Sequence, residues 1–419
     1  MRKVLGLVLS GGSGDRLGSL CTERAVSALP FGGKYRVIDF ALSNCCHSGI
    51  DLLGVLAQHA PASLNDHIGA GRSWDLDRRS GGVFILQPYQ TSHHAGWYRG
   101  TADAITQNAD WIDEQDPRLV LVLSGDHVYR MDYRALLDAH DRRGARVTVA
   151  VTPVPSSESS RFGMVAFDGE GRVSAIEEKP RTTAATHANM GVYVFEWALL
   201  REMLRVRPVD LVLDVLRPLL EAGERVSAHA FDGYWEDVGT VASYYRASLD
   251  LLRHDSRIAL HDSRWPILTR DEERMPALIR DDATIVDSLI ANGCRIQGTV
   301  ERSILFPGVS VAAGAHISDS IVFADTTIET GARIDCSILD KYVRIGEHAR
   351  IGEEASAPRE GLEWLSGLCV VGKDSWVPPN GRMQRPSQLG IGGRYEDFPD
   401  GLLQPGSVVP ARHWFEEIR

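Results

Sequence analysis

The hydrophobic pattern changes character near residue 250. Before that point, short runs that are apolar on both faces alternate with segments whose apolar residues recur every three or four positions. The runs predict buried strands of a mostly parallel sheet, and the segments predict helices that cover it. The predicted strands are 4–9, 51–57, 119–123, 147–151 and 189–195, with a hairpin over 162–177, and the predicted helices are 101–112, 133–143 and 210–222.

The second part of the chain repeats itself every 17 residues. The tripeptide Ser-Ile-Leu at 303–305 returns as Ser-Ile-Val at 320–322 and as Ser-Ile-Leu at 337–339. In each repeat two aliphatic residues stand six positions apart, as in the pair Val311 and Ile317. Six-residue rungs, three to a turn, predict a parallel β-helix. The open ends of such a coil need cover, which favours oligomerisation through it.

These patterns predict an α/β protein in which a Rossmann-like, mostly parallel sheet is followed by a left-handed parallel β-helix. The predicted boundaries place the first domain over 1–252 and a polar linker over 253–280. The β-helix of hexapeptide-type repeats is predicted over 281–375. Two consecutive prolines and several glycines predict an irregular C-terminal tail over 376–419.

The net charge, the apolar runs and the cysteines of the chain limit which partners and which cellular location are expected. The 419 residues carry a formal net charge of −11, so no nucleic-acid or acidic-membrane partner is expected. No apolar run approaches the length of a membrane span, and the apolar residues after Met1 are too few for a secretory signal. The six cysteines show no C-x-x-C pair, which favours the reducing cytoplasm.

A glycine-rich loop follows the first predicted strand, with the sequence Ser-Gly-Gly-Ser-Gly-Asp-Arg over 10–16. Such a turn can bring backbone N–H groups up to phosphate oxygens, and Arg16 can add a fixed positive fork. The spacing matches neither the P-loop nor the dinucleotide fingerprint. From the loop alone, an ordinary tight turn therefore stays open as an alternative.

Four other features of the sequence carry candidate chemistry. Asp126 follows the central apolar strand, and Asp237 is a second acid in Trp-Glu-Asp-Val-Gly over 235–239. Two carboxylates beside phosphates suit Mg²⁺, although Asp126 could equally cap a helix. Lys179 directly follows a predicted strand and could hold a phosphate, the alternative being a solvated surface lysine. The small residues that open the helix at 100–104 leave room for a base or sugar ring, or for close helix packing.

Read together, these motifs closely resemble the ADP-glucose pyrophosphorylase (glucose-1-phosphate adenylyltransferase) family. The likeness runs in order over roughly residues 3 to 372. It is carried by LSGGSGDRL at 9–17, RA at 24–25, PFGGKYRVIDFALSN at 30–44, SGI at 48–50, GWYRGTADA at 96–104, QN at 107–108, SGDH at 124–127, EKP at 178–180, MGVYVF at 190–195 and YWEDVGT at 234–240.

The resemblance implies a tetrameric, Mg²⁺-dependent enzyme that joins a nucleoside triphosphate to a sugar 1-phosphate and releases pyrophosphate. It implies that Arg16, Asp126, Asp237 and Lys179 are the catalytic residues and that Asp126 and Asp237 hold Mg²⁺. The implied nucleotide-binding residues are Leu9, Gly11, Gly12, Gly14, Asp15, Arg16, Gln58, Gly100, Thr101 and Ala102. The implied sugar-phosphate-binding residues are Tyr98, Gly163, Glu178, Lys179, Asn189, Asp210 and Trp235.

The chain departs from the family pattern around both substrates. Val26 stands where the family has a lysine near the triphosphate, Glu23 replaces a basic residue, and Asn189 replaces a serine. Only Asp210 and Asp214 remain of an acidic sugar-binding motif. Three hypotheses stay open: an enzyme that makes an NDP-sugar, with ADP-glucose as the default, an enzyme for a glucose-like cyclitol 1-phosphate of the valienol type, and a non-catalytic regulatory subunit. The sequence does not specify the base.

Overall fold

The computed structural model describes residues 3–90, 96–258, 260, 262–354 and 363–412. The chain divides into two compact units. The first comprises 1–12, 38–235 and 261–268, and the second comprises 13–37, 236–260 and 269–419. The segment after the glycine loop thus belongs with the C-terminal half of the chain, which the hydrophobic pattern does not predict.

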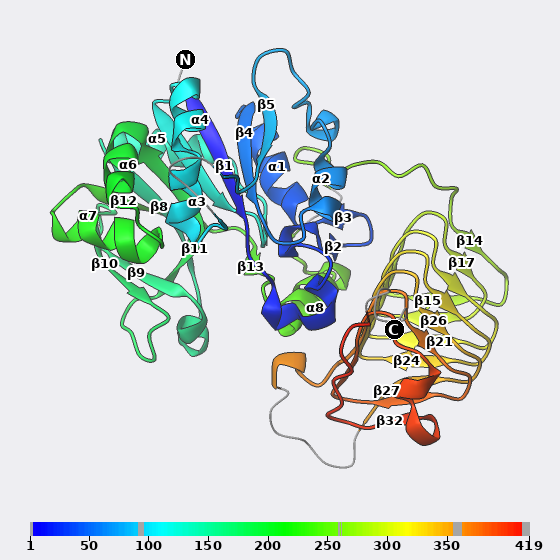
Figure 1. Cartoon of the computed structure of the whole chain (residues 1–419). Coiled ribbons are helices and arrows are strands. Elements are labelled where there is room, and N and C mark those ends of the chain that lie inside the picture. Colours follow the sequence, from blue (N-terminus) through cyan, green and yellow to red (C-terminus); the bar gives the residue numbers. More distant parts are fainter. Residues whose placement is uncertain (1–2, 91–95, 259, 261, 355–362, 413–419) are drawn as a thin grey trace. The chain divides into compact units, whose positions relative to one another are not determined.

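A nine-stranded sheet forms the centre of the first unit (Figure 1). The neighbours β6, β1, β4 and β5 are parallel, whereas β11 runs antiparallel to β6, β8 and β9. The order is β10-β9-β11-β6-β1-β4-β5, with β8 joining β11 to β12. The strands are β1 Val4–Ser10, β4 Leu52–Ala57, β5 Gly82–Leu86, β6 Leu119–Ser124, β8 Val147–Pro153, β9 Gly163–Phe167, β10 Val173–Glu178, β11 His187–Glu196 and β12 Val226–Ala230. The predicted strands and hairpin are confirmed.

Alternate residues of these strands build the core. Leu5 and Leu7 of β1 share one buried cluster with Val120 and Val122 of β6, because successive side chains of a strand point to opposite faces. That cluster also takes in apolar residues of the helices α3, α4, α6 and α7, which therefore cover this face. The helices of the unit are α1 Ile38–His47, α2 Ala62–Ile68, α3 Thr101–Gln107, α4 Ala109–Gln115, α5 Tyr133–Arg142, α6 Trp197–Met203 and α7 Arg217–Glu221.

Two predicted helices differ in detail. The helix expected over 101–112 is broken at Asn108, whose side-chain amide donates to the carbonyl of Ala104 at 2.8 Å and to the hydroxyl of Tyr98 at 3.0 Å. The helix expected over 210–222 begins as a π-helical turn, Val212–Leu216, before α7. Pro218 lacks an N–H for the regular ladder, which is why the backbone widens before it.

The second unit contains the β-helix, whose short strands stack in three parallel sheets (Figure 1). Residues at equivalent positions of the repeat lie in register, as Ile304, Ile321 and Ile338 do. Inside the prism, Val311, Ile328 and their equivalents are fully buried. The strands are β14 Leu278–Ile279, β15 Thr284–Val286, β16 Leu289–Ile290, β17 Arg295–Ile296, β18 Thr299–Glu301, β19 Ile304–Leu305, β20 Ser310–Val311, β21 His316–Ser318, β22 Ile321–Val322, β23 Thr327–Ile328, β24 Arg333–Asp335, β25 Ser337–Leu339, β26 Arg344–Ile345, β27 Arg350–Glu353 and β28 Cys369–Val371.

The C-terminal tail is not irregular throughout, and this corrects the prediction for 376–419. The strands β29 Trp376–Val377, β30 Arg382–Gln384, β31 Ser387–Leu389 and β32 Leu402–Leu403 extend the three sheets. Val377, Met383 and Leu389 keep the six-residue spacing and are fully buried. The prolines and glycines lie between these strands, at the corners of the coil, so they do not interrupt the rungs. Residues 413–419 lie outside the described part of the chain.

The segment 13–37 packs within this second unit. It contains the helical turns η1 Asp15–Cys21 and η2 Val26–Ala28 and the strand pair β2 Pro30–Phe31 and β3 Tyr35–Arg36. Arg24 donates to Asp340 of the β-helix at 2.9 Å, and both side chains are buried. Helix α8 (Val241–Leu249), which leads into the turn η7 (Asp250–Leu252), joins the same unit. There the hydroxyl of Tyr244 donates to the carbonyl of Pro30 at 2.6 Å.

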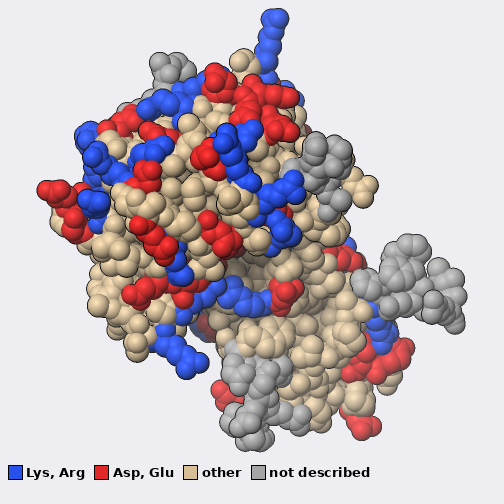
Figure 2. All heavy atoms as spheres, turned by 60° about the vertical axis from the view of Figure 1, so that its left-hand side comes forward, with Lys and Arg blue, Asp and Glu red and all other residues tan. Residues whose placement is uncertain are grey.

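Basic and acidic side chains are interspersed over the face drawn in Figure 2. Opposite charges also form ion pairs, such as those of Arg146 with Glu196 and Glu224. In the described part of the chain, no helix is long and apolar enough to cross a membrane.

Candidate active site

The glycine loop begins where β1 ends, beside the end of β6. Leu9 pairs with Ser124, and the N–H of Gly125 donates to the carbonyl of Leu9 at 2.9 Å. A β-carbon on Gly125 would lie 2.9 Å from that same carbonyl oxygen, so only glycine allows the two strand ends to approach this closely. Asp126, the residue after Gly125, therefore lies close to Ser10, where the glycine loop begins. This is the edge at which parallel sheets bind ligands.

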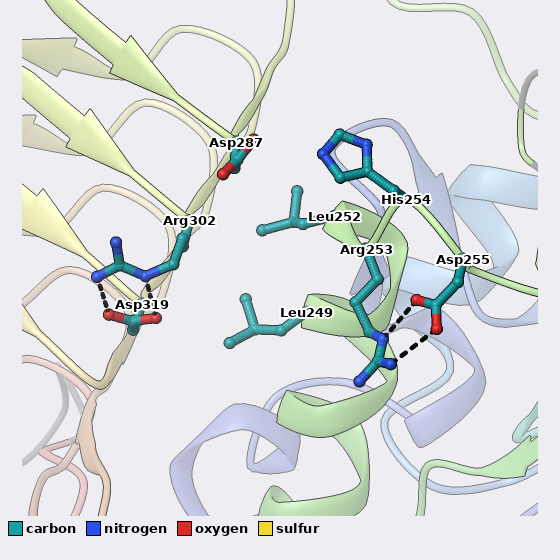
Figure 3. Close-up of a pocket in the computed structure, with 8 residues that line it drawn as sticks. All are labelled: Leu249, Leu252, Arg253, His254, Asp255, Asp287, Arg302 and Asp319. Atoms are coloured by element: carbon teal, nitrogen blue, oxygen red, sulfur yellow. Dashed lines mark hydrogen bonds and ion pairs between the residues drawn. The ribbon is translucent and has the colours of Figure 1, made fainter.

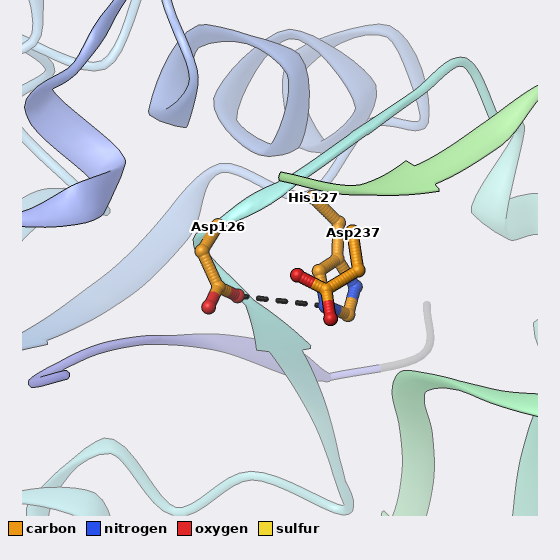
Figure 4. A group of neighbouring side chains, drawn as sticks. All are labelled: Asp126, His127 and Asp237. Atoms are coloured by element: carbon orange, nitrogen blue, oxygen red, sulfur yellow. Dashed lines mark ion pairs between the residues drawn. The ribbon is translucent and has the colours of Figure 1, made fainter. Parts of the chain in front are cut away.

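Asp126, His127 and Asp237 form a cluster whose possible metal-ligand atoms all lie within 4.8 Å of one another (Figure 4). The hydroxyl of Ser124 donates to Oδ1 of Asp126 at 2.7 Å, which orients this carboxylate. Asp237 belongs to β13 (Trp235–Asp237), the strand that pairs with β7 (His127–Tyr129). Its Oδ1 accepts from the N–H of Gly239 at 2.8 Å.

The chemistry of these donors fits Mg²⁺. Two half-buried carboxylates are the number that Mg²⁺ takes from protein when phosphate oxygens and water complete its shell. The imidazole of His127 is a softer ligand that suits zinc or iron better. Its Nδ1 already lies 2.9 Å from the carbonyl oxygen of Met190, to which it can donate. We therefore assign the candidate metal positions to Asp126 and Asp237, with His127 as their neighbour.

Aromatic contacts hold His127 and Trp235 in place. Their rings meet edge to face, with the ring centroids 5.2 Å apart. Trp235 also packs against Phe162 with ring centroids 5.2 Å apart. Phe162 directly precedes Gly163, and its carbonyl accepts from the N–H of Lys179 at 3.1 Å. The acidic cluster and the β9–β10 hairpin are thus joined by a continuous run of packed side chains.

Three of the residues implied to bind the sugar phosphate, Gly163, Glu178 and Lys179, lie on or directly after that hairpin. Glu178 pairs with Gly163, and a β-carbon on Gly163 would lie 3.0 Å from Oε2 of Glu178 and 3.7 Å from the β-carbon of Asn189. A glycine at position 163 therefore keeps the space between the two side chains open. Lys179 is exposed, with its Nζ 3.4 Å from Oε1 of Glu178. Its φ of 44° lies in the left-handed region, where a non-glycine residue is uncommon.

Tyr193 lies next to Asn189 in this group of residues, and no sequence motif indicates a role for its hydroxyl. Its hydroxyl accepts from the amide of Asn189 at 2.8 Å. Burial raises the pKa of this phenol, and the charges of Asp210 and Glu178 raise it further, so it stays protonated and can donate. Oδ1 of Asp210 also accepts from the N–H groups of Val212 and Leu213, each at 2.8 Å. Asp210 therefore caps the following helical turn.

The start of α3 lies against the chain at Val209. The N–H of Ala102 donates to the carbonyl of Val209 at 2.9 Å, and the hydroxyl of Thr101 accepts from the N–H of Leu211 at 2.9 Å. A β-carbon on Gly100 would lie 2.5 Å from the Val209 carbonyl oxygen, so the glycine serves close packing here. Gly100 and Thr101 thus make close packing contacts with the 209–211 segment, and their role in binding the nucleotide stays a prediction.

Gln58 and Tyr98 form a second pair near the loop. Oε1 of Gln58 accepts from the N–H of Tyr98 at 2.7 Å, and its amide donates to the Tyr98 carbonyl at 3.2 Å. The Gln58 side chain lies 3.9 Å from where a β-carbon on Gly11 would be, whereas Gly12 has open space on that side. Burial raises the pKa of Tyr98 to about 12, so its hydroxyl serves as a neutral group.

Arg16 is exposed in the second unit, beside the turn that contains Asp237. Its Nη2 lies 3.2 Å from where a β-carbon on Gly239 would be, and Oδ1 of Asp237 lies 2.9 Å from the same point. Because Gly239 has no β-carbon, the Arg16 guanidinium and the Asp237 carboxylate can both occupy the space beside it. Gly14 adopts the left-handed region with a φ of 71°, and the exposed Asp15 begins η1 directly after it. The loop thus turns sharply at Gly14 to present Arg16.

The cavity drawn in Figure 3 is a separate feature of the second unit, with a volume of about 450 Å³. None of the candidate site residues lines it. Leu249 and Leu252 form its apolar wall. Its two arginines are already paired with carboxylates, Arg253 with Asp255 and Arg302 with Asp319. It is therefore not a ready site for phosphate.

Comparison with known proteins identifies the family. The nucleotidyl transferase model matches residues 5–254, and a GlmU-like C-terminal hexapeptide model matches 277–371. The chain is 47% identical to a glucose-1-phosphate adenylyltransferase of Thermomicrobium roseum over 98% of both proteins. It is 42% identical to one of Thermosipho africanus over 93% of this chain and 97% of the relative. The chain belongs to the glucose-1-phosphate adenylyltransferase family of nucleotidyl transferases.

Against this family's pattern, the most consequential departure is Val26. In the structure it is buried, and its Cγ2 lies 2.8 Å from where a β-carbon on Gly14 would be. An apolar methyl group thus packs against the glycine loop at the position of the family lysine. Glu23, the second departure, pairs with Lys373 of the β-helix at 2.9 Å. Both substitutions alter the charge of the segment that carries Arg16.

Proposed function

We propose that this member of the family is an active, Mg²⁺-dependent glucose-1-phosphate adenylyltransferase, which joins ATP and glucose 1-phosphate to give ADP-glucose and pyrophosphate. The observation that carries the proposal is the grouping within the first unit. There Gly163, Glu178, Lys179 and Asn189 lie in one continuous run of contacts with the cluster around Asp126. The names of the relatives support adenylyl transfer to glucose 1-phosphate.

In this proposal the protein provides binding and charge, with no covalent nucleophile. A phosphate oxygen of the sugar 1-phosphate attacks the α-phosphorus of ATP, a new P–O bond forms, and the bond to the β-phosphate oxygen breaks. The electron pair leaves with pyrophosphate. The glycine loop and Arg16 hold the β- and γ-phosphates and neutralise the charge that builds up on them. Lys179 binds the phosphate of the sugar and so orients its attacking oxygen.

Asp126 and Asp237 would hold Mg²⁺, which supplies positive charge to the phosphates when it is bound. Around the sugar, Glu178 offers carboxylate acceptors, and Asn189 and the protonated Tyr193 offer polar contacts from the other side. The thiol nearest to the loop, Cys21, is not a nucleophile, because burial raises its pKa to about 12.

The assembly and location of the enzyme are part of the same proposal. The apolar residues Leu278, Ile279 and Val286 of the first β-helix coil are exposed, which supports a homo-oligomer, and we propose a tetramer. The cysteines are present as free thiols, which agrees with a cytoplasmic enzyme.

The test is release of pyrophosphate by the purified protein, with Mg²⁺ and a panel of nucleoside triphosphates paired with sugar and cyclitol 1-phosphates. Turnover fastest with ATP and glucose 1-phosphate is the expected result. Turnover with a glucose-like cyclitol phosphate in place of glucose 1-phosphate would replace the proposed acceptor. Binding of ATP in calorimetry without turnover of any pair would identify a regulatory subunit instead.

A further inference from the structure

One of the C-terminal coils of the β-helix reaches the loop that carries Arg16. Oε1 of Gln388, in β31, accepts a hydrogen bond from the backbone N–H of Ser19 at 3.1 Å, and this bond is buried. The two residues are 369 positions apart in the sequence and belong to the same unit. Gln388 lies beyond residue 371, where the matched hexapeptide model ends.

The position of Gln388 interrupts an apolar column. In register along one β-helix sheet stand Ile304, Ile321, Ile338 and Val370, each fully buried, and Gln388 follows them on the next coil. These side chains are absent from the cluster inside the prism, which instead contains their neighbours in sequence. The column is thus on the outer face of the sheet. It changes from aliphatic to polar where a buried backbone N–H needs an acceptor.

The backbone of Gln388 is hydrogen-bonded to the segments on both sides of it, so its side chain can position a neighbouring group. Its own N–H donates to the carbonyl of Ser407 at 2.8 Å, and its carbonyl accepts from the N–H of Val409 at 2.8 Å. Its strand also pairs with β28 on the opposite side. Because the backbone of Gln388 is hydrogen-bonded to two neighbouring segments, its α-carbon is fixed in place and the side chain extends from a fixed point.

The loop is shaped to receive this side chain. Gly18 has φ 55° and ψ −134°, a conformation that essentially only glycine adopts. A β-carbon there would lie 2.3 Å from Oε1 of Gln388 and 2.8 Å from the ring of Trp364. Both the conformation and the contact therefore require glycine. On either side of this point Leu17 and Leu20 are fully buried, so the backbone that follows Arg16 is anchored within a few residues.

We infer that Gln388 is a positioning residue for Arg16, acting through the N–H of Ser19. The inference rests on the proposed role of Arg16 in binding the triphosphate. Without the acceptor, the Ser19 N–H is left buried and unsatisfied, and the loop gains alternative conformations in which Arg16 no longer faces the phosphates. Nucleotide binding then weakens, whereas the contacts among Gly163, Glu178 and Lys179 on the β9–β10 hairpin are unaffected.

Three variants test this inference. Gln388→Met keeps the size of the side chain and removes the acceptor, Gln388→Glu keeps an acceptor, and Gln384→Met is a matched control in the neighbouring strand β30. We expect Gln388→Met to raise the KM for ATP about tenfold and to leave the KM for glucose 1-phosphate within about twofold. Gln388→Glu should recover most of the loss, and Gln384→Met should behave as the unmodified protein.

Amide hydrogen exchange over residues 13–21 gives a second measurement that does not depend on turnover. Exchange should be faster in Gln388→Met than in Gln388→Glu, Gln384→Met or the unmodified protein. If Gln388→Met does not fold, Gln388→Asn takes its place, because the shorter side chain withdraws the acceptor by one methylene. Unchanged exchange and an unchanged KM for ATP would overturn the inference, and so would equal changes in both KM values. An unmodified protein without turnover would refute the proposed function, while the exchange result still decides the contact between Gln388 and Ser19.

Discussion

Val26 packs against Gly14: its Cγ2 lies 2.8 Å from the point that a β-carbon on Gly14 would occupy. The side chain of Val26 therefore lies against Gly14, where the glycine loop turns. Gly14 precedes Arg16 by two residues. Because Val26 is buried, with 6% of its surface exposed, a charge introduced there would act at short range in a partly dry environment. The loop keeps its glycines and its arginine but receives an apolar group from this neighbour.

Replacing Val26 by lysine should increase the activity of this enzyme. The aliphatic stem of lysine can follow the path of Val26, and its ammonium group then adds one positive charge to the proposed triphosphate site. We expect kcat/KM for ATP to rise about tenfold or more. Steady-state kinetics will measure this, with Val26→Met as a control for the added length. If both variants are no faster than the unmodified protein, the missing cation does not limit catalysis.

Asp126→Asn tests the proposed metal site. The asparagine oxygen can still accept from the hydroxyl of Ser124, so the local structure is preserved while one charge is lost. Turnover should fall at least about 10²-fold, and the Mg²⁺ concentration for half-maximal activity should rise. Asp110→Asn, an exposed acid on α4, is the matched control and should leave both values unchanged. Near-normal turnover in Asp126→Asn would remove this carboxylate from the metal site.

Lys179→Gln separates the two substrates. Because the proposed role of Lys179 is to hold the sugar phosphate as a point charge, the KM for glucose 1-phosphate should rise about 10- to 100-fold, with little change in the KM for ATP. The control is Lys3→Gln, which removes an exposed lysine paired with Asp116. An equal rise in both KM values would show that Lys179 affects the whole site.

Lys341→Met should stabilise the protein at neutral pH. Burial lowers the pKa of Lys341 to about 8, and the charges of Arg36 and Arg24 contribute to this. The folded state therefore disfavours the charged lysine, and this cost is complete below about pH 8 and disappears as the pH approaches the ordinary value of 10.5. At pH 7 the variant should gain about 1–3 kcal/mol in the free energy of unfolding.

Denaturant unfolding at pH 7 and at about pH 9.5 will check the prediction for Lys341, because the advantage of the variant should shrink at the higher pH. Lys373→Met is the control with the opposite sign. Burial lowers the pKa of Lys373, but the Glu23 carboxylate outweighs this and leaves it raised. Its removal should therefore destabilise the protein. A constant advantage of Lys341→Met at both pH values would contradict the proposed cost of charging Lys341.

The repeating and alternating patterns of the chain predicted most of the fold. The apolar runs at 4–9 and 119–123 became neighbouring parallel strands, and the 17-residue repeat became the stacked coils of the β-helix. The tail was predicted wrongly because its prolines and glycines resemble a loop, although Val377, Met383 and Leu389 keep the six-residue spacing. His127 and Tyr193 were inside recognised motifs, yet no spacing signal distinguished them from core residues.

The sequence by itself determined the strands, the repeat, the glycine loop and the candidate groups at Arg16, Asp126, Lys179 and Asp237, because these follow from local periodicity and side-chain chemistry. Only the tertiary structure decided which distant groups meet. The pairing of Arg24 with Asp340, the packing of Val26 on Gly14, and the hydrogen bond from Ser19 to Gln388 depend on how the segment after the loop folds onto the coils. Such contacts join positions that no local pattern relates, so they are fixed only when the whole chain has packed.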